Sequence, residues 1–169
     1  MKIQYGIHWL NFSTWLWKNI QLLKDIIKKI SNGIPEFNFK GVTCGVVDER
    51  GELSATYKGI SQNDLGIRTD VIDNIPKALG MKMLIRSMSP KVIIADEIGK
   101  KEDVDAIEYA VTSGVKGIFT AHGSDLEQIE HNPILNQLII NGYIEKVLAM
   151  DKQRNVHLLY EKQSKRKVS

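Results

Sequence analysis

The sequence predicts an α/β domain with a mostly parallel sheet and flanking helices. Two observations support this fold class. Residues 42–47, 91–95 and 115–119 are short apolar runs, which is typical of buried strands. Segments with the apolar spacing of helices separate these runs, and such alternation of strands with helices indicates βαβ units.

The first helix is predicted from residue 21, where apolar side chains gather on one face and charged side chains on the other. A Ser-Asn-Gly sequence at 31–33 ends it. Between residues 51 and 83 the pattern predicts small helices that alternate with loops. A helix over 102–113 follows the second strand and stops at Gly114.

The C-terminal third is expected to add two helices and a hairpin. Ser124 or Asp125 can cap a helix, and another is predicted over 133–140 with proline at its start. Residues 143–150 and 156–160 flank a polar turn, which predicts an antiparallel hairpin that closes the sheet. The chain shows neither internal repeats nor a linker, so we expect one domain.

Composition and charge limit the class of protein. With 43% hydrophobic and 25% charged residues the chain is ordinary globular material, and its single cysteine, Cys44, fits a reducing cytosol. The net charge is +3, and the basic tail at 161–169, with four basic side chains and one acidic, accounts for all of it. Because the rest is neutral, we expect no nucleic-acid partner and interpret the tail as a solvated terminus.

The longest uncharged run, residues 3–17, is shorter than the ~20 apolar residues that a membrane-spanning helix needs. No transmembrane segment is therefore expected. All three tryptophans nevertheless lie in this run, so a position in the membrane interface is an alternative.

Polar side chains follow all three predicted strands at their carboxyl ends. Asp48-Glu49-Arg50 follows the first strand, Asp96-Glu97 the second, and Thr120 with His122 the third. Ligands of open parallel sheets bind at this edge, where loops diverge and helix N-termini point outward. A single such strand end is more often a turn or a cap, but three together favour a site.

The run 92–97 has the layout of a Walker B element. Its apolar residues bury the strand, Asp96 can hold a magnesium ion through water, and Glu97 can orient or deprotonate an attacking water. His122 follows one βα unit later, where a sensor of the γ-phosphate is expected. Arginine at 50, 68 or 86 can neutralise a phosphate or form a structural ion pair, and spacing leaves this choice open.

The chain also resembles a known family, stage III sporulation protein AA. Residues 45–52, 62–71, 80–90, 95–99 and 120–123 carry the resemblance, which covers about 22–150. This family is similar to ring-forming secretion ATPases with a RecA-like, P-loop NTPase core. The resemblance implies a cytoplasmic ATPase that binds ATP and Mg²⁺ and forms a homo-oligomeric ring. It would work with membrane proteins of the channel between mother cell and forespore, with a peripheral position at the mother-cell membrane as an option.

The resemblance assigns roles to individual residues. Asp96 would hold the metal, and His122, Thr120 and Arg68 would contact the nucleotide. The residues expected to act in catalysis are Glu97, Glu49, Arg50 and Arg86.

The phosphate-binding loop of the family should precede the first helix, and no G-x-x-x-x-G-K-[ST] occurs here. We therefore divide the chain into an aberrant aromatic-rich segment (1–20), a RecA-like core (21–160) that lacks its first strand, and the tail. Tryptophan has one codon, TGG, so reading 12–19 one nucleotide later permits Ser-Pro-Pro-Gly-Cys-Gly-Lys-Thr, a phosphate loop. A frameshift is our hypothesis for the loss.

These observations predict a sporulation ATPase-family protein whose ATP binding is impaired. Two alternatives remain. The chain could be a non-catalytic assembly subunit of the same apparatus. It could also be a metal-dependent hydrolase that uses Asp48, Asp96, Glu97 and His122 around one or two cations.

Overall fold

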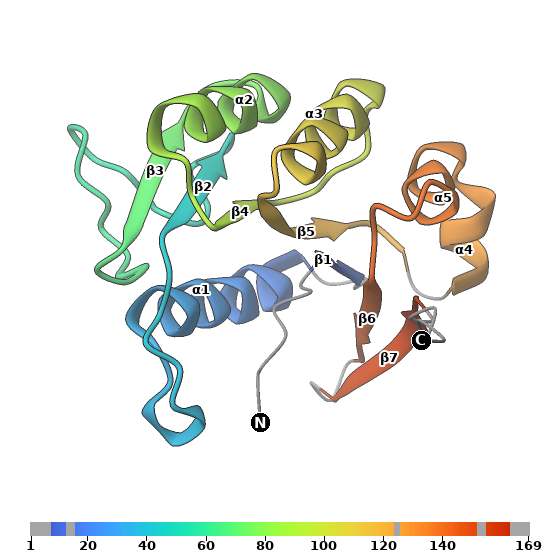
Figure 1. Cartoon of the computed structure of the whole chain (residues 1–169), viewed down its shortest axis with the longest axis horizontal. Helices are drawn as coiled ribbons and strands as arrows, with labels where there is room; N and C mark the ends of the chain where they lie inside the picture. Colours follow the sequence, from blue (N-terminus) through green and yellow to red (C-terminus); the bar gives the residue numbers. More distant parts are fainter. Residues whose placement is uncertain (1–7, 13–15, 124–125, 152–154, 163–169) are drawn as a thin grey trace, which may run out of the picture.

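The computed structural model of the chain describes residues 8–12, 16–123, 126–151 and 155–162. Its strands form one sheet in the order β3-β2-β4-β5-β1-β6-β7 (Figure 1). Neighbouring strands are parallel except for β6 and β7, which are antiparallel. The mostly parallel sheet and the C-terminal hairpin are thereby confirmed. The strands are β1 (His8–Phe12), β2 (Cys44–Asp48), β3 (Thr69–Asp73), β4 (Val92–Ala95), β5 (Lys116–Ala121), β6 (Lys146–Met150) and β7 (Val156–Glu161).

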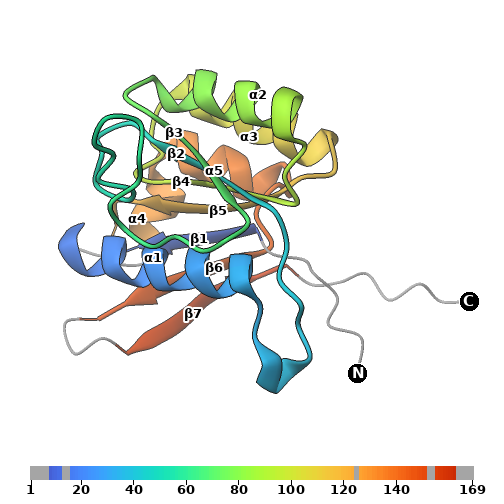
Figure 2. The same ribbon diagram turned by 90° about the vertical axis from the view of Figure 1, so that its left-hand side faces the viewer.

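Helices cover both faces of the sheet, as Figures 1 and 2 show. The helix α1 packs on one face, and the other α-helices pack on the opposite face. Alternate residues of the central strands face the two sides, so Ile94 of β4 packs with α1 while Ile93 packs with α2 and α3. The helices are α1 (Leu16–Asn32), α2 (Lys77–Met88), α3 (Lys101–Thr112), α4 (Leu126–His131) and α5 (Pro133–Ile140), with a short 3₁₀ helix, η1 (Pro35–Phe37).

The N-terminal segment differs from its prediction. Residues His8–Phe12 form β1, which pairs with β5 on one side and β6 on the other, so the expectation of a core without its first strand is wrong. The helix α1 begins at Leu16 rather than at residue 21. Residues 13–15, which join β1 to α1, and residues 163–169 of the basic tail lie outside the described residues.

Most other elements lie close to their predicted bounds, and α5 has the bounds predicted for it. The exception is the region expected to hold small helices and loops, which contains the edge strand β3 and the first half of α2. The proposed caps Ser124 and Asp125 of α4 are outside the described residues.

Parallel pairing brings the carboxyl ends of β2, β4 and β5 to one edge of the sheet. Asp48 ends β2, Ala95 ends β4 and Ala121 ends β5, and the registers place these three strand ends side by side. The helices α2 and α3 begin at the same edge, because α2 follows β3, which is parallel to β2, and α3 follows β4 by a short connection. The fold thus gathers the polar strand ends that the sequence singled out.

Candidate functional site

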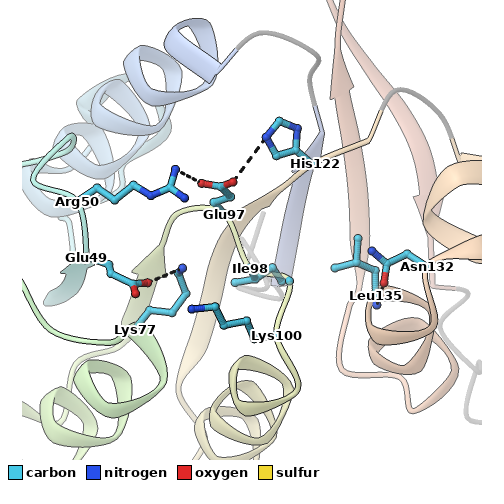
Figure 3. Close-up of a pocket in the computed structure, with 10 residues that line it drawn as sticks. Glu49, Arg50, Lys77, Glu97, Ile98, Lys100, His122, Asn132 and Leu135 are labelled. Carbon is cyan, nitrogen blue, oxygen red and sulfur yellow. Dashed lines mark hydrogen bonds and ion pairs between the residues drawn. The ribbon is translucent and has the colours of Figure 1, made fainter.

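A pocket of about 300 Å³ lies at this edge of the sheet (Figure 3). The loops after β2, β4 and β5 provide its walls, together with the starts of α2, α3 and α5. Three pairs of an acidic and a basic side chain lie in this pocket. Arg50 and His122 both contact Glu97, and Lys77 contacts Glu49. The lining residues are Glu49, Arg50, Lys77, Glu97, Ile98, Gly99, Lys100, His122, Asn132 and Leu135.

The Glu97 carboxylate is contacted by side chains that follow the two neighbouring strands, β2 and β5. It forms an ion pair with Arg50 and lies 3.6 Å from His122 Nε2 through its second oxygen. Its backbone is in the left-handed region, with φ of 43°, which is uncommon for a residue with a side chain. The Glu97 N–H donates a hydrogen bond of 2.8 Å to Thr120 Oγ1. The sequence prediction that Glu97, Arg50, Thr120 and His122 share one site is consistent with this geometry.

Glu49 pairs with a lysine that the sequence analysis did not select. Lys77 Nζ donates a hydrogen bond of 2.7 Å to Glu49 Oε2. This contact holds the pKa of the Glu49 carboxyl below its ordinary value. Because Lys77 is only 7% exposed, the pair forms part of the pocket wall rather than of the solvated surface.

Asp96 is buried behind the pocket, with 4% of its surface exposed. Burial, which disfavours the charged carboxylate, raises its pKa to about 6, and the charges of Asp48 and Glu52 act in the same direction. The Lys77 ammonium opposes this rise. Among the described residues, Asp96 Oδ1 has no hydrogen-bond partner. A buried carboxylate oxygen without a partner is costly, and binding of a cation would satisfy it.

Asp48, which the sequence analysis grouped with Glu49 and Arg50 after the first predicted strand, is a structural residue here. Its carboxylate accepts hydrogen bonds from the backbone N–H groups of Glu52, Leu53 and Ser54 and from the Ser54 hydroxyl. These bonds fold the loop after β2 back onto the end of the strand. They also point Glu49 and Arg50, the next two residues, into the pocket.

Two of the predicted site residues lie away from the pocket. Arg68 precedes β3 at the amino ends of the strands, where its Nη1 donates a hydrogen bond of 2.9 Å to the carbonyl of Ser31. Arg86 lies in the last turn of α2 and is exposed, whereas Lys77 at the first turn of the same helix lines the pocket. The structure therefore brings Arg50, and neither Arg68 nor Arg86, to the strand-end carboxylates.

Lys77, Lys100 and Asn132 line the pocket without having been selected from the sequence. Lys77 follows Pro76, and this pair by itself indicates only the start of a helix. Asn132 caps α5, since its side chain accepts hydrogen bonds from the N–H groups of Ile134 and Leu135. Lys77 is the first residue of a helix that follows a strand, but this strand, β3, was not predicted from the sequence, so its place in a βα unit gave no signal.

The residues fit a magnesium ion in part. The unpartnered Oδ1 of Asp96 is the kind of oxygen that Mg²⁺ uses when water and phosphate supply its other ligands. In the described part of the chain no three His, Cys, Asp or Glu side chains are grouped to hold a metal by themselves. This arrangement does not favour the hydrolase alternative, because the Asp48 oxygens are engaged by the loop.

The residues do not fit the phosphates of ATP in the same way. A phosphate loop needs glycines whose N–H groups approach the phosphates at the start of a helix. The connection from β1 to α1 spans residues 13–15, and no glycine occurs in the sequence between Gly6 and Gly33. The strand-end carboxylates are therefore not accompanied by a glycine-rich sequence before α1.

None of the helices in the described ranges combines the length and the apolar character needed to cross a membrane.

Solved structures with a similar fold are ATPases of secretion and pilus systems. The ATPase DotB of Legionella pneumophila matches with a TM-score of 0.58 and 14% identity over 89% of this chain and 43% of that one. The pilus retraction motor PilT, solved with bound ADP, matches with a TM-score of 0.60 and 13% identity over 93% of this chain and 48% of that one. At such identities the likeness establishes the fold alone, and it confirms the RecA-like α/β architecture.

Sequence comparison gives a narrower result. Stage III sporulation protein AA of Bacillus subtilis (strain 168) is 39% identical over 144 residues, which cover 83% of this chain and 46% of that protein. The chain thus spans about half the length of this relative. A sequence model of the family described as "Sporulation stage III, protein AA" matches residues 7–167. The chain therefore belongs to the sporulation stage III protein AA family.

Proposed function

We propose that this chain is a sporulation ATPase-family domain in which the strand-end carboxylates are assembled but the phosphate-binding loop is lost. It would bind Mg-ATP weakly and fail to turn it over. The proposal combines the site at the carboxyl ends of β2, β4 and β5 with the missing glycine-rich loop before α1.

The observation that carries the proposal is the connection between β1 and α1. In the sheet, β1 lies beside β5, and Phe12 pairs with Ala121, so the chain leaves β1 next to Thr120 and His122. Open α/β sheets bind phosphates at such a central strand end, on the N-terminus of the following helix. The sequence of this connection contains no glycine, the residue that allows backbone N–H groups to approach a phosphate closely enough for charge-assisted contacts.

The other half of the site supports an ATPase ancestry. A magnesium ion held at Asp96 would supply charge stabilisation for the oxygens of a transferring phosphoryl group. Glu97 and Glu49 are the carboxylates placed to hold and orient a water molecule at the pocket opening. Arg50 is the arginine within reach of the same space.

Restoring the loop is the direct test. A variant that replaces residues 12–19 by Ser-Pro-Pro-Gly-Cys-Gly-Lys-Thr keeps Lys18 and introduces the two glycines. We expect calorimetric titration with Mg-ATP to show weak or no binding by the natural chain, and binding tightened by at least about a hundredfold in the variant, since several charge-assisted contacts are regained together. Hydrolysis should appear in the variant and disappear again with Glu97→Gln.

The controls distinguish a loss of phosphate binding from a loss of folded structure. Circular dichroism should give the natural chain and the variant the same helix content. If the natural chain binds Mg-ATP tightly, or hydrolyses it at a rate that Glu97→Gln abolishes, the proposed impairment is wrong.

The frameshift hypothesis for this loss is tested on the nucleic acid. Read one nucleotide later, the codons of Phe12 to Thr14 should encode Ser-Pro-Pro, that of Leu16 cysteine and that of Asn19 threonine. The genetic code forces glycine at 15 and 17 and a basic residue at 18 in this frame, so those positions do not test the hypothesis. Other residues at 12–14 together with isoleucine at 19 contradict the frameshift and make the absent loop a natural variation.

We also propose that the intact relatives power a channel between mother cell and forespore as oligomeric rings that bind its membrane proteins. Family membership supports this assignment. The test is complementation in B. subtilis, with its own protein carrying residues 12–19 of this chain at the corresponding place. The chimera should fail to restore sporulation, whereas the parent protein should restore it. Sporulation at the parental level would contradict the impairment.

The alternative in the same apparatus is an assembly subunit that contributes to the ring without hydrolysing ATP. The Mg-ATP titration distinguishes such a subunit from an active enzyme. Mixing the chain with the B. subtilis relative distinguishes a subunit from a domain that does not assemble. A subunit should co-elute with the B. subtilis relative in gel filtration, whereas a domain without an assembly role should elute alone.

A further inference from the structure

Lys77 is a buried cation in the wall of the pocket. It lies at the first position of α2, with 7% of its surface exposed, and its Nζ is 2.7 Å from Glu49 Oε2. Lysine is rarely buried unless its charge is compensated, because removing an ammonium from water is costly. Figure 3 shows the Lys77 side chain directed toward Glu49, across the pocket from Glu97. The placement of this ammonium therefore requires a compensating set of acidic groups.

Besides Glu49, the acidic group related to this ammonium is Asp96. Asp96 directly follows β4, is 4% exposed, and has its pKa rise opposed by the charge of Lys77. Ala95 pairs with Val47, so Asp96 lies beside the end of β2 that leads into Glu49. Asp48, at the end of β2, and Glu52, in the loop after it, act on Asp96 with the opposite sign. Only Asp48 of these carboxylates is fully engaged by loop hydrogen bonds, while Asp96 Oδ1 lacks a partner within the described ranges.

We propose that Lys77 is a tethered cation that serves the carboxylates Glu49 and Asp96 in place of a free divalent ion. Its ammonium neutralises Glu49 directly and Asp96 through space, so the strand ends of β2 and β4 stay together without a bound metal. A divalent ion that reached Asp96 would have to share this space with a like charge. The domain would therefore reject divalent ions on its own and accept them only with an anionic ligand that offsets the ammonium. This inference rests on the proposed function in one respect, the assignment of Asp96 as the cation-holding carboxylate.

The experiment measures Mn²⁺ binding to the full chain in the absence of nucleotide, by electron paramagnetic resonance of the free ion. We expect weak binding by the natural protein and binding at least about tenfold tighter in Lys77→Met, the order expected when a unit charge beside a divalent ion is removed. Lys82→Met is the matched control, because Lys82 lies on the same helix but is exposed and does not line the pocket, and this variant should bind Mn²⁺ as the natural protein does. Adding Asp96→Asn to Lys77→Met should abolish the gain.

A second variant guards against misfolding, because Lys77→Met leaves Glu49 without its partner. The double variant Lys77→Met with Glu49→Gln removes both charges of the pair and should also bind Mn²⁺ more tightly than the natural protein. Equal affinity of the natural protein and both Lys77 variants would overturn the inference, as would tight binding of Mn²⁺ by the natural protein. Either result leaves the proposed function standing, since that proposal fails only on Mg-ATP binding or turnover.

Discussion

Glu97 and Thr120 are joined by a hydrogen bond between neighbouring strand ends. The Glu97 N–H donates to Thr120 Oγ1 at 2.8 Å, and the following N–H, of Ile98, donates to the Thr120 carbonyl at 2.8 Å. These two bonds fix the backbone that carries Glu97 in its left-handed conformation. Thr120 thus acts as the anchor of a catalytic candidate, a role different from the nucleotide contact expected for it from the family resemblance.

Thr120→Val should release this anchor while keeping the shape of the side chain. Because the Glu97 N–H would lose its partner in a buried setting, we expect a loss of about 1–3 kcal/mol in the free energy of unfolding. Urea denaturation measures this loss. Thr120→Ser keeps the hydroxyl and is the control, with a smaller cost. Equal stability of Thr120→Val and the natural protein would contradict the anchoring role.

The loop after β2 should depend on the charge of Asp48. Asp48→Asn places an amide group where Asp48 Oδ2 now accepts from the Ser54 N–H and hydroxyl, so donors would face donors. We expect a loss of about 2–4 kcal/mol, since hydrogen bonds to a charged group are lost and a buried N–H is left unpaired. Ser54→Ala removes one of the four bonds and should cost about 1 kcal/mol by the same denaturation measurement. A cost for Asp48→Asn no larger than that of Ser54→Ala would show that the loop has other support.

Close packing between α2 and the sheet predicts an unusual effect of alanine. Gly80 lies inside α2, where Gly→Ala normally gains about 1 kcal/mol from helix propensity. Here the new Cβ would lie 2.6 Å from Val47 Cγ1, and Val47 is fully buried. We expect Gly80→Ala to lower the free energy of unfolding by about 1–3 kcal/mol because of overpacking. Gly99→Ala, with no atom within 4 Å of the new Cβ, should change it by less than about 0.5 kcal/mol. A stabilising Gly80→Ala would refute the close contact.

Asp96 should make stability depend on pH in the acidic range. Its pKa is raised from 3.8 to about 6 by burial, so between these values the folded chain holds a proton that the unfolded chain releases. The free energy of unfolding of the natural protein, measured against that of Asp96→Asn, should therefore fall as the pH rises from about 4 to about 6. The fall should approach about 3 kcal/mol and level off above the folded pKa. A parallel pH profile for the two proteins would exclude this titration.

Much of the sheet could be predicted because its central strands are buried on both faces. Continuous apolar runs such as 92–95 have few interpretations other than a buried strand. The edge strand β3 was missed because its residues include Thr69, Asp70 and Asp73, and half-buried edge strands carry polar residues that resemble loops. The strand β1 was missed because it was read together with an anomalous tryptophan-rich segment.

The site was predictable where it depended on strand ends and not where it depended on helix positions. Glu97 and His122 follow buried strands, so the parallel sheet alone brings them together. The spacing of the arginines along the sequence does not determine which of them lies near the site. Of the three candidates, only Arg50 lines the pocket. Lys77 was missed because a lysine after proline at a helix start is common, and its burial arises from the packing of α2 against β2.

The position of β1 has a consequence for how the chain folds. The strand β1 precedes β5 and β6 in the chain but lies between them in the sheet, so His8 can pair with Gly117 and Trp9 with Lys146 only after these later strands have been synthesised. Such sequence-distant pairing slows folding, because loop-closure entropy is lost before the contacts that repay it can form. Until the insertion occurs, β5 and β6 each expose an unpaired edge through which nascent chains could associate.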